Sequence, residues 1–243
     1  MTPATVTPPT PTGATVTPPT PATVTPATPS RATPSRMLEK FEDPDRSALR
    51  SLVADAMIGH FAFVVDGQPR VLPIAIVADG DDILLHGSTG STWLRLLATG
   101  VPVALSVTAV DALVVARSAF ESSMNYRSAV LFGSCAPVPA HAKVATLDLV
   151  TDGLIPGRVA ELRTHTAKEL AATLILRMTV DEWSLKVSAG WPEDEAPDVA
   201  GRAWAGVLPV ATGYSHAAPA PDLAEGILVP ASVIGLLGPS TTG

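Results

Sequence analysis

The sequence predicts a mainly β fold with added helices, an α+β protein built around a small antiparallel barrel. About eight short stretches rich in β-branched residues follow one another along the chain. Tight-turn sequences such as Asp66-Gly67 join several of them, which favours antiparallel pairing of consecutive strands. Helical spacing returns at only a few places, and closing such a sheet into a barrel removes its exposed edges.

The first half of the chain combines one helix with short strands and a second, shorter helix. Asp43-Pro44 is typical of a helix start, and apolar residues then recur at helical spacing up to Gly59. A short helix over 91–98 is expected to end at Gly100. The predicted strands of this half are 61–65, 71–77 and 83–86.

The second half is richer in strands. Asp111-Ala112 predicts a tight turn between two of them, and helical patterns return over 140–151 and about 158–170. Acids and prolines over 191–198 favour a loop. The predicted strands of this half are 103–110, 113–120, 126–138, 173–180, 183–188 and 204–210.

Residues 1–36 differ from the rest in composition. The octet ATVTPPTP occurs at 4–11 and again at 14–21, and ATVTPATP follows at 22–29. Such a proline-rich repeat predicts an extended, disordered tail, and it lacks the basic start and apolar stretch of a signal peptide. We therefore expect a folded domain over 37–215 and a C-terminal extension over 216–243.

Charge and cysteine content exclude several classes of function. The formal net charge is −7, which is unfavourable for general nucleic-acid binding. The chain has a single cysteine, Cys135, so no internal disulfide or CxxC zinc site is possible. Its apolar stretches are too short to span a bilayer. The five histidines show no metal-binding spacing. These features favour a cytoplasmic protein without a metal site.

Residues 84–95, LLHGSTGSTWLR, place glycines and hydroxyl side chains where a strand is expected to pass into a helix. The unpaired amides of a helix start favour an anion, and hydroxyl groups add donors. The residues concerned are His86, Gly87, Ser88, Thr89, Gly90, Ser91 and Thr92. The segment therefore predicts a phosphate site, with an ordinary N-capped helix as the alternative.

Two arginines stand in otherwise apolar segments that resemble strands. Arg117 would share a strand face with Ala119, and Arg127 with Ala129 and Leu131. An inward-facing arginine requires a partner. That partner is either one of the chain's many carboxylates or the phosphate of a ligand, which a planar guanidinium binds well.

The motifs LLHGSTGSTWLRLL, ARSAFESSMNYRS and WAGVLPV resemble the FMN-binding split-barrel proteins, the pyridoxamine 5′-phosphate oxidase-like or flavin-nucleotide-binding group. The resemblance extends over about 43–210. It implies a six-stranded antiparallel split β-barrel of the FMN-binding type. It also implies a homodimer with FMN bound in a groove at the interface.

Site residues follow from the matching motifs. The resemblance implies that the 86–92 segment holds the phosphate and ribityl chain, that Arg127 and Ser128 lie beside the flavin, and that Trp204 packs near the cofactor. Positive charge for the phosphate would come from Arg95, Arg117 or Arg127. Lys186 lies in another matching segment, LKVSAG, without an implied role. The expected cofactor-binding set is His86, Gly87, Ser88, Thr89, Ser91, Thr92, Arg117, Arg127, Ser128 and Trp204.

The function implied by the resemblance is that of an FMN-dependent oxidoreductase. It would move a hydride between flavin and a small-molecule substrate or nicotinamide, with the cofactor doing the redox chemistry. The sequence itself shows no catalytic acid, base or nucleophile in a recognisable arrangement. The alternatives are a flavin-binding carrier or sensor without turnover, and a split barrel that holds F420 or haem.

Overall fold

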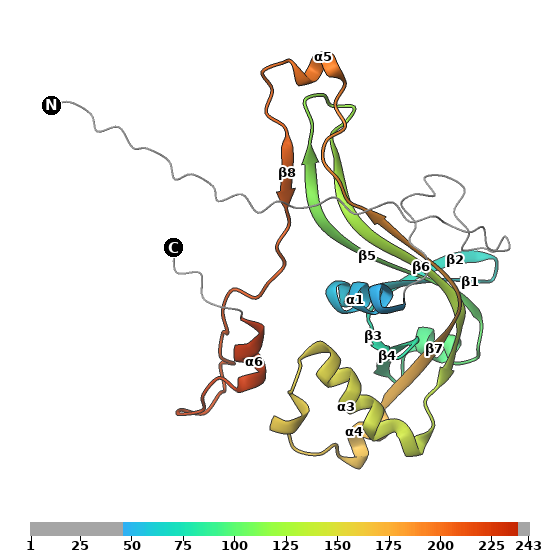
Figure 1. The fold of residues 1–243 in the computed structure, drawn as a ribbon. Coiled ribbons are helices and arrows are strands. Elements are labelled where there is room, and N and C mark those ends of the chain that lie inside the picture. Colours follow the sequence, from blue (N-terminus) through green and yellow to red (C-terminus); the bar gives the residue numbers. More distant parts are fainter. Residues whose placement is uncertain (1–45, 238–243) are drawn as a thin grey trace.

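The computed structural model describes residues 46–237, except for the side chain of residue 181. The proline-rich tail, the helix start at Asp43-Pro44 and the last six residues lie outside this part. Within it, one antiparallel sheet of eight strands is accompanied by six α-helices, so the predicted α+β class is confirmed (Figure 1).

The strands form one hydrogen-bonded path in the order β2-β1-β5-β6-β7-β4-β3, with β8 paired to β5. No ladder joins β3 back to β2 among the described residues, so the barrel is split and not closed. There are eight strands where the resemblance implied six. They are β1 (Ile58–Val65), β2 (Gln68–Ala75), β3 (Val77–Asp79), β4 (Asp82–Ser88), β5 (Pro102–Val115), β6 (Ser123–Pro137), β7 (Thr173–Ser188) and β8 (Gly206–Pro209).

The β1–β2 hairpin confirms the Asp66-Gly67 prediction. Both residues have positive φ, 50° and 71°, as a two-residue hairpin turn requires. The predicted strand 71–77 is interrupted near Ile76, whose amide donates to the Met57 carbonyl at 2.9 Å. This break separates β2 from β3 and lets the chain turn into the second part of the barrel.

The predicted turn at Asp111-Ala112 is wrong. β5 continues through it as one strand, and the β5–β6 register shifts between Val110 and Ala112. This irregularity is a β-bulge, which keeps Asp111 in the strand and places its carboxylate beside a side chain of β6. The predicted strands 173–180 and 183–188 are likewise one strand, β7, with a shift opposite Phe132 and Gly133.

Several helices differ in extent from those that the sequence predicted. The helix expected over 158–170 is a 3-10 turn (Val159–Glu161) followed by α4, which begins with a Thr166 capping box. A short helix, α5, lies in the expected loop 191–198. The α-helices are α1 (Arg46–Ala56), α2 (Thr92–Leu97), α3 (Lys143–Leu154), α4 (Ala167–Ala172), α5 (Ala196–Val199) and α6 (Ala231–Leu236).

The main hydrophobic core lies inside the split barrel. Alternate strand residues such as Phe61, Leu105 and Leu131 are fully buried there. Helix α1 closes one end with Leu52 and Val53, which its helical spacing places on one face. Each large apolar side chain buried in this way contributes about 1.5–3 kcal/mol.

Three long strands extend beyond the barrel. In Figure 1, β5, β6 and the end of β7 rise above α1 as an arm, and β8 and α5 lie beside its tip. The chain then returns to α6, where Ser232 donates from its amide and hydroxyl to the Glu161 carboxylate at 3.0 and 2.5 Å. None of the helices in residues 46–237 is long and apolar enough to cross a bilayer.

Candidate functional site

The β4–α2 junction contains the hydroxyl-rich segment. Ser91 caps α2 by accepting a hydrogen bond from the Leu94 amide at 3.3 Å. Ser88 Oγ, at the end of β4, accepts from the Gly90 amide at 3.1 Å. Both hydroxyl oxygens therefore accept hydrogen bonds from nearby backbone amides. This is what an ordinary N-capped helix, the alternative to a phosphate site, predicts. Thr92 is the first residue of α2, which is only six residues long.

Two further residues of the junction have structural roles. Thr89 donates from its amide and its hydroxyl to the Ala172 carbonyl, at 2.9 and 3.2 Å, which ties the junction to the end of α4. A Cβ on Gly87 would stand 2.6 Å from Leu94 Cδ1, so glycine lets α2 pack closely on β4. A phosphate site at this junction stays a prediction.

His86 differs from its neighbours because its Nδ1 is buried without a hydrogen-bond partner among the described residues. Burial lowers the pKa of His86, since an imidazolium loses solvation in apolar surroundings. The neutral ring therefore predominates near pH 7 and retains a free hydrogen-bonding position.

Arg127 is held by two carboxylates. Its Nε and Nη2 donate to Asp111 of the β5 bulge, with the shortest distance 2.7 Å, and its Nη1 donates to Asp55 of α1 at 2.7 Å. These contacts raise the pKa of Arg127 above its already high ordinary value. One cation faces two anions, so the cluster carries net negative charge and offers little attraction to a phosphate.

The sequence suggested that Arg117 lies in a strand, but the structure places it outside the strands. It follows β5 in a bend, where its Nη1 and its backbone amide donate to the carboxylate of Asp194 at 2.8 and 2.7 Å. The Asp194 side chain is 1% exposed. The pair fixes the segment after β7 against the tip of the arm, which is the structural role considered for this arginine.

The two predicted parts of the site lie far apart within one chain. Ser88 pairs with Thr173 at the start of β7, whereas Arg127 pairs with Val187 near its end. About 45 Å of strand separates these positions. The 86–92 segment and Arg127 therefore do not meet in one protomer, and a second copy would be needed to bring them together.

A cavity of about 770 Å³ opens beside the Arg127 cluster. Its walls come from the end of α1, the bulge of β5, β6, the end of α3 and the C-terminal segment. Met57 lies in the wall with φ 55°, an uncommon conformation for a residue other than glycine, and its Sδ accepts from Tyr214 Oη at 3.6 Å. The volume falls within the range of about 300–1,000 Å³ that is typical of cofactor and small-molecule sites.

The outer face of the sheet holds Ser128. It lies opposite Thr108 on β5 and Lys186 on β7, and the Lys186 ammonium donates to the Tyr126 hydroxyl at 2.5 Å. Trp204 is 67% exposed beside the start of β8, near the tip of the arm. An exposed indole there is available to cover a ligand or a second chain.

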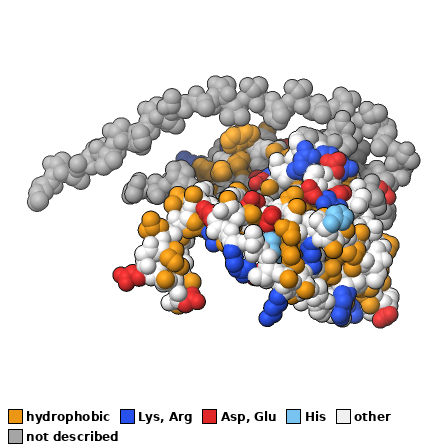
Figure 2. All heavy atoms as spheres, turned by 90° about the horizontal axis from the view of Figure 1, so that it is seen from below, with side chains coloured by type: hydrophobic (Ala, Val, Ile, Leu, Met, Phe, Trp, Pro, Cys, Tyr) orange, Lys and Arg blue, Asp and Glu red, His pale blue; other side chains and the backbone are white. Residues whose placement is uncertain are grey.

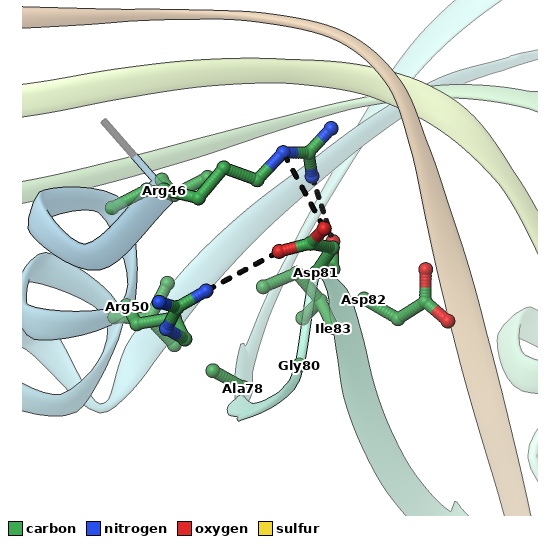
Figure 3. A pocket seen from close by; sticks show the side chains of 9 residues that line it. Arg46, Arg50, Ala78, Gly80, Asp81, Asp82 and Ile83 are labelled. Atoms are coloured by element: carbon green, nitrogen blue, oxygen red, sulfur yellow. Dashed lines mark hydrogen bonds and ion pairs between the residues drawn. The ribbon is translucent and has the colours of Figure 1, made fainter. Parts of the chain in front are cut away.

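A second, smaller pocket between α1 and the β3–β4 turn is filled by its own ion pairs. Figure 3 shows Arg46 and Arg50 of α1 pointing toward Asp81, with the Arg50–Asp81 contact at 3.2 Å. Only about 10 Å³ remains open, at most the room for one water molecule. Figure 2 shows charges of both signs interspersed with apolar side chains on the lower face, without a continuous basic stripe.

Apart from Arg127, the sequence did not indicate the residues that line the cavity. Asp111 was interpreted as part of a turn, and Asp55 was not singled out. Met57 was counted among the apolar residues at helical spacing, but it lies between α1 and β1 with a positive φ. Tyr214 lies near the end of the segment assigned to the domain. A charged residue inside an apolar strand was the one available signal, and it applied to both Asp111 and Arg127.

Comparisons with known proteins identify the family. The sequence profile described as pyridoxamine 5′-phosphate oxidase matches residues 45–187. The chain belongs to the pyridoxamine 5′-phosphate oxidase family. This confirms the resemblance found in the sequence. No curated protein matches the chain.

Two solved structures are similar to this family member over most of its length. An FAD and heme binding protein from Mycobacterium smegmatis is 50% identical, with a TM-score of 0.78, and the match covers 82% of this chain and 98% of that one. The flavocytochrome Anf3 from Azotobacter vinelandii is 29% identical, with a TM-score of 0.77, covering 86% and 97%.

Proposed function

We propose that this member of the pyridoxamine 5′-phosphate oxidase family is a redox protein that binds both a flavin and a haem. The observation that carries the proposal is the 50% identity to an FAD and heme binding protein over 98% of that protein's length. The similarity to a flavocytochrome supports it independently. Flavin and haem together supply hydride and single-electron transfer.

The flavin is proposed to be FAD. The sequence favoured FMN by resemblance to the family as a whole, but the relative at 50% identity is named for FAD. FMN stays the alternative, and both share the isoalloxazine ring and the first phosphate. Hydride transfer between this flavin and a nicotinamide or other small molecule is the proposed reaction, with a carrier or sensor role as its alternative.

The cavity beside α1 fits a haem in size and in the apolar part of its lining. Its volume is about 770 Å³, and most of its side chains are apolar. Among the described lining residues, the thioether of Met57 and the phenol of Tyr214 are atoms of types that ligate haem iron. Arg127 lies in the same wall, but its charge is already balanced by Asp55 and Asp111.

A homodimer is proposed from the outer face of the sheet. Exposed apolar side chains gather on this face, where solvent contact is unfavourable and a second copy would cover them. They are Ile58, Val64, Val71, Val110 and Val130. Sedimentation of the purified chain measures the oligomeric state, and a monomer at micromolar concentration would overturn the dimer.

The buried free thiol of Cys135 is compatible with the proposed cytoplasmic location.

Cofactor extraction tests the proposed function. The full chain is produced in cells supplied with a haem precursor, purified and denatured, and the released molecules are identified by mass. We expect FAD and haem, each near one per chain. If the extract contains FMN and not FAD, only the identity of the flavin nucleotide in the proposal is wrong. Neither flavin nor haem, after incubation with an excess of both, would overturn the proposal. Bleaching of the bound flavin by NADH or NADPH under anaerobic conditions separates the enzyme from the carrier.

A further inference from the structure

The chain between β8 and α6 is a long connection without regular structure. β8 is paired with β5, and residues 210–230 then form no helix or strand before α6 begins (Figure 1). Connections of more than about 12–15 residues without secondary structure are uncommon in compact domains. They are usually either linkers or functional segments such as lids and binding loops. This connection borders the cavity of about 770 Å³, which favours a functional segment.

Residues 210–236, which include α6, form the outer wall of this cavity. Thr212, Gly213 and Tyr214 line it from the connection, and Leu236 lines it from α6. The opposite wall belongs to α1, β5, β6 and the end of α3. A ligand that fills the cavity would therefore lie between the C-terminal segment on one side and the sheet with α1 and α3 on the other.

The connection is weakly attached between its two ends. Among the described residues, no backbone hydrogen bond joins 211–229 to the barrel or to a helix, and the backbone bonds within this stretch only close local turns. All residues of 218–229 are exposed, and Leu228 is 85% exposed. Tyr214 Oη donates to Met57 Sδ at the long distance of 3.6 Å. Few buried contacts and few backbone hydrogen bonds are features of a segment that opens at a low cost in free energy.

The far end of this wall is held by a contact between Ser232 and Glu161. Ser232, at the start of α6, donates from its amide at 3.0 Å and from its hydroxyl at 2.5 Å to the Glu161 carboxylate. Arg158 donates to the same carboxylate at 3.0 Å and so holds it in position after α3. Hydrogen bonds to a charged group are stronger than those between neutral groups. One charged contact therefore fixes α6 at the end of an otherwise loosely held segment.

We propose that residues 210–236 form a lid over the cavity and that the Glu161–Ser232 contact holds this lid closed. When the contact breaks, α6 and the connection move away from α1 and α3, while β8 stays paired with β5 as the fixed end. Lids of this kind control how fast a ligand enters and leaves its site. The inference rests on the proposed function only in naming haem as the ligand of the cavity.

Amide hydrogen exchange of the full chain without cofactor tests whether the lid opens separately. The amides of Val233 and Ile234 donate to the Pro230 carbonyl at 3.1 and 3.0 Å and report on α6. They should exchange faster than the amides of β5 and β6. Glu161→Ala should accelerate them by a further 10- to 100-fold, roughly the loss of a charged hydrogen bond, and leave the barrel unchanged.

The control for this measurement is Glu225→Ala, which removes the same charge from an exposed position on the lid. It should exchange like the wild type. Exchange of α6 only together with the barrel strands would overturn the lid, because the segment would then not open by itself. Equal exchange of α6 in Glu161→Ala and the wild type would overturn the role of the Glu161–Ser232 contact.

Transfer of haem from the loaded full chain to an excess of apomyoglobin tests whether the lid controls release. Glu161→Ala should release haem about 10- to 100-fold faster than the wild type, if thermal melting shows an intact fold. Ser232→Ala should give a smaller acceleration, because its amide still donates to Glu161. Glu225→Ala should release haem at the rate of the wild type.

The two measurements separate the inference from the proposed function. A chain that takes up no haem would remove haem from the proposed function, and the exchange measurement would still decide whether the lid opens. A chain that binds haem, but releases it equally fast from Glu161→Ala and the wild type, would leave the proposed function intact and overturn the inference.

Discussion

Arg127 and Asp111 form a bidentate ion pair across the β5 bulge. Nη2 donates to Oδ1 at 2.7 Å, and Nε donates to both carboxylate oxygens at 3.1 and 3.2 Å. The bulge is what directs Asp111 toward β6, and Asp55 extends the contact to the end of α1. The pair therefore joins three elements in the wall of the cavity.

Arg127→Met should destabilise the fold more than it weakens flavin binding. The change leaves Asp55 and Asp111 close together without their shared cation, at a cost of about 1–3 kcal/mol. Chemical denaturation measures it. The control is Arg163→Met, which removes an exposed pair with Glu169 and should change stability much less. A large loss of flavin affinity with unchanged stability would show that Arg127 belongs to the flavin site instead.

Asp194→Ala should loosen the tip of the arm. Its buried carboxylate accepts from the Arg117 amide and guanidinium, and without it the arginine is left partly buried and unpaired. Amide hydrogen exchange near Arg117 should become about 10- to 100-fold faster, while exchange in the barrel core stays unchanged. Equal exchange rates in variant and wild type would show that the pair does not hold the segment.

Gly133→Ala should be severely destabilising. A Cβ at this position would stand 1.9 Å from the Thr179 carbonyl oxygen, which is backbone and cannot rotate away. The clash lies at the register shift between β6 and β7, and we expect a loss of more than about 2 kcal/mol. Gly190→Ala is the control, because nothing lies within 4 Å of its Cβ. Matching denaturation midpoints for the two variants would contradict this packing.

The stability of the chain should depend on His86 at mildly acidic pH. Burial lowers the pKa of His86 in the folded state, so the unfolded chain takes up this proton at higher pH. The contribution of the neutral ring to the free energy of unfolding is therefore complete above about pH 6.5 and decreases as the pH falls below this value. His86→Gln should lose less stability than the wild type between about pH 7 and pH 5. His216→Gln controls for replacing an exposed histidine, and parallel curves for all three proteins would refute the assignment.

Cys135 should be unreactive in the folded chain. It is 2% exposed on β6, and burial raises the pKa of its thiol to about 12. The thiolate is the reactive form, so a thiol reagent at mildly alkaline pH should modify the native protein only slowly. Denaturant should expose one thiol per chain. Rapid labelling without denaturant would mean that this part of β6 opens locally.

Local signals in the sequence predicted the elements that depend on local chemistry. Asp66-Gly67 specified its hairpin because two positive φ angles are a property of the turn itself. The residue pattern over 83–98 predicted a strand followed by a short helix, which the structure has. The bulge at Asp111 was mistaken for a turn because its stabilising partner, Arg127, lies on the next strand.

The candidate site was harder to predict because its contacts depend on strand register. The pairing of Arg117 with Asp194 joins positions 77 residues apart, and no local pattern indicates it. Lys186 was noticed in the sequence without a role. Its position opposite Ser128 appears only when β6 and β7 are aligned residue by residue. Exposure and charge balance around each cation are likewise properties of the folded chain.

The absorption spectrum of the purified full chain, recorded before and after anaerobic reduction, tests the central claim most directly. A flavin band in the blue and a Soret band should both be present. Reduction should bleach the first and shift the second. A protein that stays colourless after incubation with excess FAD and haem would contradict the account.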